Sequence, residues 1–160
     1  MATAPRPSYE DILRAVGQLL DRDEWRDVSL AEEPAELVVC GTRREGHGRA
    51  AATLRLAPED LARLRNEARS RRGWARPAGD AGYQARLRAV GWLAEVAGLR
   101  ELRVTEVGAD LRLQGRVAAA REGGERRVVD KRLTPTELDR LLARLHGLRG
   151  THTGQLRPWW

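Results

Sequence analysis

Apolar residues in the first half of the chain change their spacing twice. They recur at every third or fourth position, then at every second position, and then at every third or fourth position again. The first spacing is typical of a helix that buries one face, and the second is typical of a strand. Ser8 and Pro58 stand where an N-cap and a first helical residue are expected. We predict, in chain order, a helix over 9–20, strands around 28–30, 37–39 and 50–56, and a helix from Pro58.

The second half of the chain repeats this order of elements. Helical spacing over 83–93 is followed by three alternating stretches, and then by a segment with the form of a capping box, Thr134-Pro135-Thr136-Glu137. The pair Gly123-Gly124 marks the tip of the last predicted hairpin. The apolar strand positions are Leu102, Val104, Leu111, Leu113, Val117, Val129 and Leu133.

Individual residues recur as well, so we interpret the chain as an internal duplication. At an offset of 74 positions, the first helix matches the third through Tyr9/Tyr83, Leu13/Leu87, Arg14/Arg88, Ala15/Ala89, Val16/Val90, Gly17/Gly91 and Leu19/Leu93. After the second strand the offset becomes 77, which places three extra residues between two strands of the second copy. An ordered run of matches with one hairpin-sized gap is not expected by chance.

These patterns predict an α+β fold built from two αβββα copies. Each copy would form an antiparallel three-stranded meander with both helices on one face, because amphipathic helices and a short sheet can then bury each other. We expect the copies to be related by a pseudo-twofold axis, since neither has much core alone. The predicted boundaries are 8–73 for the first repeat, 74–81 for a linker, 82–150 for the second repeat and 151–160 for a C-terminal tail.

Charge distinguishes the two copies. The chain carries 29 Lys+Arg and 23 Asp+Glu, a formal net charge of +6, and Lys131 is its only lysine. Residues 9–73 hold 12 arginines and 13 acidic residues, whereas residues 83–150 hold 13 arginines and one lysine against 9 acidic residues. The net charge of the first copy is therefore −1 and that of the second is +5. Such an asymmetry indicates that the two copies differ in function.

Strand alternation places the basic side chains of the second copy on one face of its sheet. If the leucines and valines face the helices, four arginines face the opposite way: Arg103, Arg112, Arg116 and Arg132. Guanidinium groups on one pleated surface suit phosphate recognition. Our first hypothesis is a small non-enzymatic protein that binds DNA or RNA through this face. Acidic residues on the same strands, such as Asp110 and Asp130, leave open that the arginines pair within the sheet.

The corresponding face of the first copy is small and partly apolar, which supports a second hypothesis. The chain would be a protein–protein adaptor, an accessory subunit of a larger assembly or a homodimer. Trp92 replaces Gln18 of the first copy and would pack between the copies or against a partner. Tryptophans outside the predicted elements would contact protein, or would stack on bases. The candidate partner-binding residues are Val38, Cys40, Trp74, Trp92, Trp159 and Trp160.

The sequence contains no recognisable catalytic, cofactor or metal-binding pattern. The single cysteine, Cys40, excludes an internal disulfide and is typical of a reducing compartment, so we expect a cytoplasmic protein. His146 and His152 lack metal-ligand spacing, and no phosphate-cradling glycine loop opens a helix. No apolar stretch has the length of a membrane span, and residues 1–10 lack the apolar core of a signal peptide. The excess of arginine over lysine is typical of a GC-rich bacterial genome.

Overall fold

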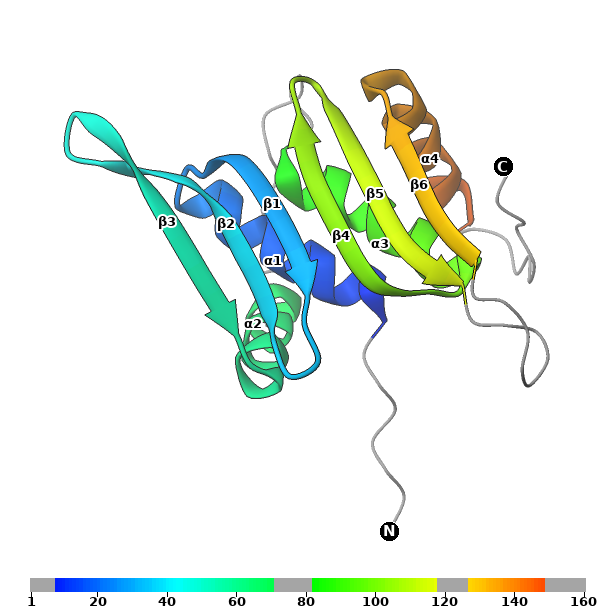
Figure 1. Cartoon of the computed structure of the whole chain (residues 1–160), viewed down its shortest axis with the longest axis horizontal. Coiled ribbons are helices and arrows are strands. Elements are labelled where there is room, and N and C mark those ends of the chain that lie inside the picture. Colours follow the sequence, from blue (N-terminus) through cyan, green and yellow to red (C-terminus); the bar gives the residue numbers. More distant parts are fainter. Residues whose placement is uncertain (1–7, 71–81, 118–126, 149–160) are drawn as a thin grey trace, which may run out of the picture.

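The computed structural model describes residues 8–70, 82–117 and 127–148. Within these ranges it is a mixed α+β structure with four helices and six strands, as expected from the alternation of spacing (Figure 1). The elements are α1 (Tyr9–Arg22), β1 (Arg26–Glu32), β2 (Leu37–Glu45), β3 (Gly48–Leu56), α2 (Pro58–Ser70), α3 (Tyr83–Ala97), β4 (Leu99–Val107), β5 (Asp110–Val117), β6 (Arg127–Leu133) and α4 (Pro135–Leu148). The predicted linker, the Gly123-Gly124 hairpin tip and the tail lie outside the described residues.

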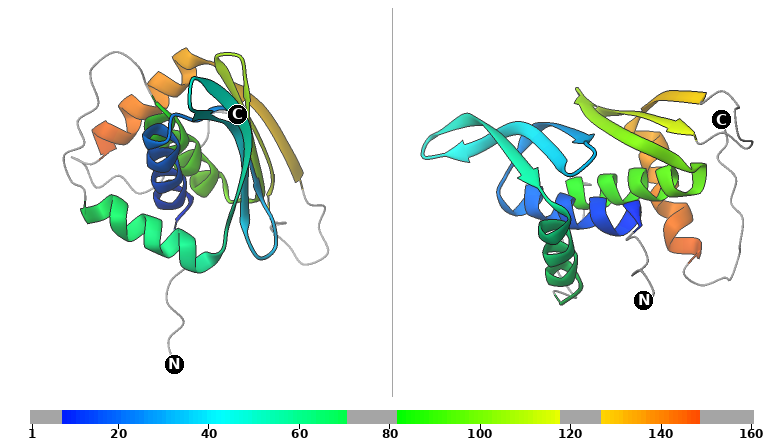
Figure 2. Two further views of the ribbon diagram at one scale, coloured as in Figure 1. Left: turned by 90° about the vertical axis from the view of Figure 1, so that its left-hand side faces the viewer. Right: turned by 60° about the horizontal axis from the view of Figure 1, so that its bottom comes forward.

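The six strands form one continuous antiparallel sheet in the order β3-β2-β1-β4-β5-β6. All four helices lie on one side of it (Figure 2). The two expected meanders are therefore present, but they are joined edge to edge rather than forming separate sheets. The joining strands are β1 and β4, where Leu30 pairs with Val104, with Ser29 opposite Thr105 and Ala31 opposite Arg103.

Short-range chemistry explains where the helices begin and end. The Ser8 hydroxyl accepts a hydrogen bond from the Asp11 N–H at 3.2 Å, which satisfies a free donor of the first turn of α1. Thr134 does the same for the Glu137 N–H of α4, at 3.2 Å. Gly98 ends α3 with φ of 68°, a left-handed conformation that costs glycine little.

One hydrophobic core lies between the sheet and the helices. Its side chains come from every strand and from α1, α3 and α4, and the largest fully buried ones include Leu20, Leu93, Leu111 and Leu133. Trp25, just before β1, also belongs to this core, because only 5% of it is exposed. The core is continuous across the two halves of the chain.

Helices α1 and α3 form the centre of the helical layer and approach each other at two glycines. A Cβ atom on Gly17 would lie 2.6 Å from the Gln84 Cα, and one on Gly91 would lie 2.4 Å from the Tyr9 carbonyl oxygen. Each glycine thus contacts the first turn of the other helix, so the two helices run antiparallel. Any larger residue at either position would push the backbones apart.

Candidate functional site

The face of the sheet opposite the helices is covered by no element of the part of the chain that the structure describes (Figures 1 and 2). We call it the open face. The strand registers assign its side chains, from β3 to β6, as Arg49, Ala51, Thr53, Arg55, Val38, Cys40, Thr42, Arg44, Ser29, Ala31, Arg103, Thr105, Val107, Asp110, Arg112, Gln114, Arg116, Val128, Asp130 and Arg132. Both sets of residues that strand alternation assigned to one face therefore share a single surface.

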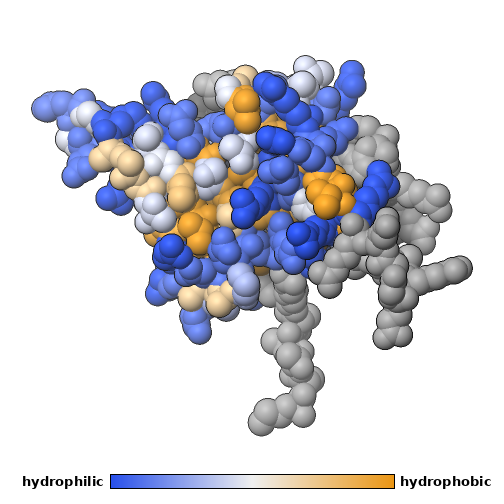
Figure 3. Space-filling model, in the orientation of Figure 1, coloured by the Kyte–Doolittle hydropathy of each residue, from blue (hydrophilic) through white to orange (hydrophobic). Residues whose placement is uncertain are grey.

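The first half of the open face, from β1 to β3, has small and nearly uncharged side chains at its centre, between Arg55 at one end and Arg44 and Arg49 at the hairpin end. Val38 and Cys40 are half-buried, although no helix or strand of the described ranges covers them. The Cys40 Sγ lies 3.8 Å from the Thr53 Oγ1. The Arg55 guanidinium is paired with the Glu36 carboxylate. Apolar and weakly polar residues gather over β1 and β2, whereas hydrophilic residues prevail over β5 and β6 (Figure 3).

Three of the four arginines predicted to bind nucleic acid are paired with carboxylates of neighbouring strands. The Arg112 Nε and Nη2 donate to the two oxygens of Asp130 at 2.9 and 2.6 Å. This hydrogen-bonded pair lowers the pKa of Asp130 below its usual value. Arg132 donates to the Asp110 carboxylate at 2.5 Å. Arg116 lies 3.3 Å from the Glu101 carboxylate.

Arg103 differs from the other three arginines. It is exposed, it lies opposite Ala31 of β1, and it has no ion pair with any residue in the described ranges. The second half of the open face consequently carries four arginines but one uncompensated positive charge. The strongly basic surface expected from strand alternation alone is therefore close to electrically balanced.

Neither of the two tryptophans in the described ranges, Trp25 and Trp92, lies on this face. Trp92 is half-buried and packs against the hydrophobic core from α3. Trp74, Trp159 and Trp160 lie outside the described residues. Of the six candidate partner-binding residues, the structure places Val38 and Cys40 together on the open face, next to each other across one intervening residue of β2.

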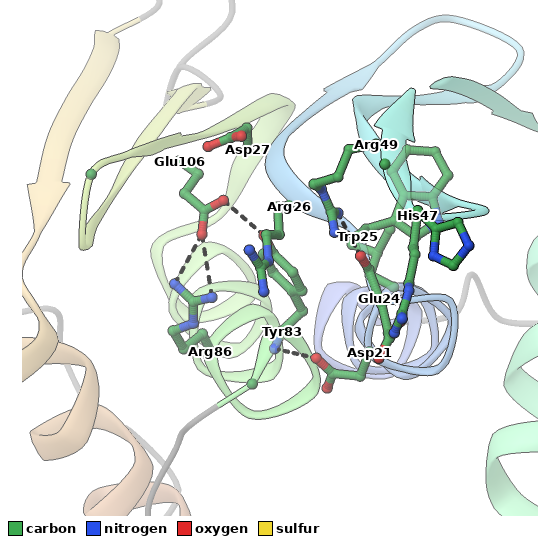
Figure 4. A pocket seen from close by; sticks show the side chains of 15 residues that line it. Asp21, Glu24, Trp25, Arg26, Asp27, His47, Arg49, Tyr83, Arg86 and Glu106 are labelled. Carbon is green, nitrogen blue, oxygen red and sulfur yellow. Dashed lines mark hydrogen bonds and ion pairs between the residues drawn. The ribbon is translucent and has the colours of Figure 1, made fainter. Parts of the chain in front are cut away.

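A second concave feature lies at one end of the sheet, on its helical side. It is a pocket of about 840 Å³ between the end of α1, the β2–β3 hairpin, the start of α3 and the β4–β5 turn. Side chains of both charges line it, among them Asp21, Arg49, Arg86 and Glu106 (Figure 4). No pattern in the sequence predicted this pocket.

One cluster of polar contacts in this pocket is centred on Glu106. Its carboxylate accepts a hydrogen bond from the Tyr83 hydroxyl at 2.7 Å and pairs with Arg86 at 3.3 Å, while the Arg86 guanidinium lies 4.8 Å from the centre of the Tyr83 ring. Burial of the Tyr83 hydroxyl and its bond to Glu106 raise the pKa of this tyrosine well above its ordinary value. A tyrosine held protonated in this way is a poor proton donor or nucleophile at neutral pH.

The tyrosine–glutamate contact recurs at the opposite end of the helix pair, although Ile12 stands where the second half has Arg86. The Tyr9 hydroxyl donates to Glu32 at 3.1 Å, 74 positions before the corresponding residues Tyr83 and Glu106. The N–H of Tyr9 donates to Glu95 at 3.0 Å, as the N–H of Tyr83 donates to Asp21 at 2.9 Å. Because the contacts recur, they are explained by attachment of each helix N-terminus to its surroundings. The matched spacing of Tyr and Glu in the two halves was the signal that could have found them.

The described ranges bring together neither a cluster of metal ligands nor the cysteine and a histidine. No three His, Cys, Asp or Glu side chains there gather as a metal site requires. Cys40 lies within β2, whereas His47 occupies the turn between β2 and β3. The helices described are all too short or too polar to cross a membrane.

Comparisons with known proteins leave the function to be inferred from these residues. Neither the protein-family models, nor the curated proteins, nor the solved structures give a significant match to this chain.

Proposed function

We propose that this protein is a non-enzymatic adaptor or accessory subunit that holds a protein partner on the open face of its sheet. The observation that carries the proposal is the uncovered surface formed by β1, β2 and β3, which is nearly uncharged at its centre. The centre of this surface exposes few polar atoms, because its side chains are those of Ala31, Val38, Cys40 and Thr53. A face of this kind costs little to desolvate when a partner covers it.

The neighbouring charges favour a protein rather than a polyanion as the partner. Protein interfaces have a weakly charged centre and a polar rim. The open face has this organisation around Val38 and Cys40, with the Arg55–Glu36 pair at one side and Arg103 and the Arg112–Asp130 and Arg132–Asp110 pairs at the other. We infer that the partner presents a flat, mainly uncharged surface with charged groups of both signs at its margin.

Nucleic-acid binding is the second candidate function. The net charge of +5 on residues 83–150 and the uncompensated Arg103 support it. A phosphate that displaced Asp130 from Arg112 would have to compete with a two-pronged, charge-assisted hydrogen bond. We therefore rank this function below the adaptor role.

We also infer that the two halves arose by duplication and are related by a pseudo-twofold axis. The register supports this inference, because Leu30 pairs with Val104, the residue 74 positions later, and the flanking pairs exchange under the same offset. Gly17 and Gly91 support it too, since each contacts the first turn of the other's helix. Asp27 and Glu101 share an unusual positive φ, 52° and 56°, at the same offset.

The adaptor proposal can be tested through the single cysteine. A photo-crosslinker attached to Cys40 reports on the open face in extracts of the source organism. A matched control carries the same probe on the helical side, in a Cys40→Ser, Asn66→Cys variant, where Asn66 is exposed on α2. We expect a defined protein adduct from position 40, none from position 66, and loss of the adduct when Val38→Asp places a charge beside the probe.

The opposite results are equally informative. Equal adducts from both positions, or no protein adduct from Cys40, would refute the adaptor proposal. Fluorescence anisotropy with labelled DNA and RNA at two salt concentrations tests the second candidate. Nucleic-acid binding predicts affinity that falls with salt for all sequences, and Arg103→Ala should reduce the slope by about one counterion. Asp130→Asn should then strengthen binding, because it releases Arg112.

A further inference from the structure

Strand β3 forms an edge of the sheet, and its outer side has no partner strand in the described ranges. The β2–β3 hairpin turns at Gly46-His47, with φ of 60° at Gly46, so Glu45 and Gly48 close the ladder. Backbone groups in an antiparallel ladder point to alternate sides. Counting from Gly48, the residues whose N–H and C=O groups point away from β2 are Arg49, Ala51, Thr53 and Arg55.

This edge lacks the protection that β6 has at the other side of the sheet. Natural sheets block strand addition with charges, proline, bulges or short edge strands. Four of the seven residues of β6 are charged. The nine-residue strand β3 instead has an uncharged centre from 50 to 54, without proline, and its β2–β3 register is free of bulges.

The helical side of β3 is also less covered than that of β6. Leu61 and Leu64 of α2 are half-buried, whereas the corresponding Leu138 and Leu141 of α4 are fully buried. Leu54 on β3 is half-buried as well. Three apolar side chains therefore retain exposure beside the same edge, so a strand added there would bury apolar surface as well as backbone groups.

We propose that β3 pairs antiparallel with β3 of a second copy of this chain, centred on Thr53. In this register both central residues present outward backbone groups to each other. Thr53 meets Thr53 of the second copy, Ala51 meets Arg55, and on the helical side Ala52 meets Leu54. No like charges face each other, whereas centring on Ala52 would oppose Arg49 to Arg55. Because this register pairs the strand with itself without opposing like charges, we propose a second copy of the chain as the partner of this edge.

The dimer goes beyond the proposed adaptor role and can be true or false independently of it. It would extend the sheet to twelve strands, because each copy contributes six. The strand order of the dimer places the β1–β3 parts of the two open faces side by side at the centre of the twelve-stranded sheet. The paired arginines would then lie at the two outer ends, so one partner could contact both copies.

Sedimentation over a dilution series tests the dimer. We expect the wild-type chain to have twice its 17.9 kDa mass at high concentration. Thr53→Lys should raise the dimer dissociation constant about tenfold or more, because like charges would meet at the centre of the edge. Val128→Lys, on the opposite edge strand at a position 67% exposed, is the matched control and should leave the mass unchanged. Mixing Thr53→Lys with Thr53→Glu should restore association.

A disulfide test fixes the register. In a Cys40→Ser background, Thr53→Cys should crosslink two chains under copper–phenanthroline oxidation in air, because paired Cα atoms in such a ladder are about 5.5 Å apart. Ala51→Cys should not, since its own copy would lie roughly 13 Å away. A wild-type monomer at all concentrations, or a dimer indifferent to Thr53→Lys, would overturn the proposal. Equal crosslinking at both positions would overturn the register.

Discussion

Replacing Gly91 with alanine should force the two central helices apart. The new Cβ would lie 2.4 Å from the Tyr9 carbonyl oxygen and 2.7 Å from its carbonyl carbon. Both are backbone atoms, so no side chain can rotate away. Restoring ordinary contact requires α1 and α3 to separate by about 1 Å, because protein interiors contain little free space.

The expected loss of stability combines three effects. Alanine is a better helix former than glycine by about 1 kcal/mol. Overpacking of the helix interface costs about 1–3 kcal/mol. The same separation stretches the bond from the Tyr9 N–H to the Glu95 carboxylate, now 3.0 Å, and losing a hydrogen bond to a charged group costs about 1.5–3 kcal/mol. Because the helix propensity of alanine offsets part of the two losses, we expect Gly91→Ala to lower the free energy of unfolding by about 1.5–5 kcal/mol in total.

Urea unfolding followed by circular dichroism measures this difference. Gly48→Ala is the control, because a Cβ there meets nothing within 4 Å, and it should change stability by less than about 0.5 kcal/mol. Gly17→Ala should resemble Gly91→Ala. The double variant should cost less than the two single losses combined, since one separation relieves both contacts. A Gly91→Ala protein as stable as the wild type would refute the close approach of the helices.

Three further predictions concern polar contacts. Glu10→Ala should lower the free energy of unfolding, measured in urea, by about 1–3 kcal/mol, because Arg88, only 8% exposed, loses its carboxylate partner at 3.0 Å. A matched Arg88→Met variant should show a smaller loss, because it leaves no charge buried without a partner. In a Tyr9→Phe variant, where Tyr83 is the only tyrosine, tyrosinate absorbance should show Tyr83 ionising well above pH 10. The contribution of Tyr83 to stability is complete below pH 10 and is lost as the pH rises further. A midpoint near pH 10 in the folded protein would contradict the burial of Tyr83. Asp130→Asn should leave the thermal midpoint unchanged at physiological salt, because the pair it breaks is exposed, and a large shift would contradict this.

Periodicity predicted the elements and the side each strand residue faces. Leu102, Val104, Leu111 and Leu113 are buried, and the arginines between them lie on the other side. Such predictions succeed because burial of one face is a local property of a strand. The joining of β1 to β4 could not be predicted in this way, since spacing says nothing about which strand edges meet.

The charge balance of the open face was beyond the sequence for a related reason. The same strands supply Arg112 and Asp130, and only their register decides whether the two side chains lie opposite or apart. Asp130 lies opposite Gln114, next to the pair that contains Arg112, which brings the two groups within 2.6 Å. The edge position of β3 likewise depends on the order of strands rather than on the composition of any one of them.

The pairing of β1 with β4 has a consequence for synthesis on the ribosome. Val104 is made 74 residues after Leu30, so at ~5–20 residues per second β1 waits roughly 4–15 s for its neighbour. During that interval the nascent first half has two unpaired strand edges, and adjacent ribosomes on one messenger carry identical chains. Translation speed between the halves, together with chaperone access, therefore sets how many chains escape mispairing before the sheet closes.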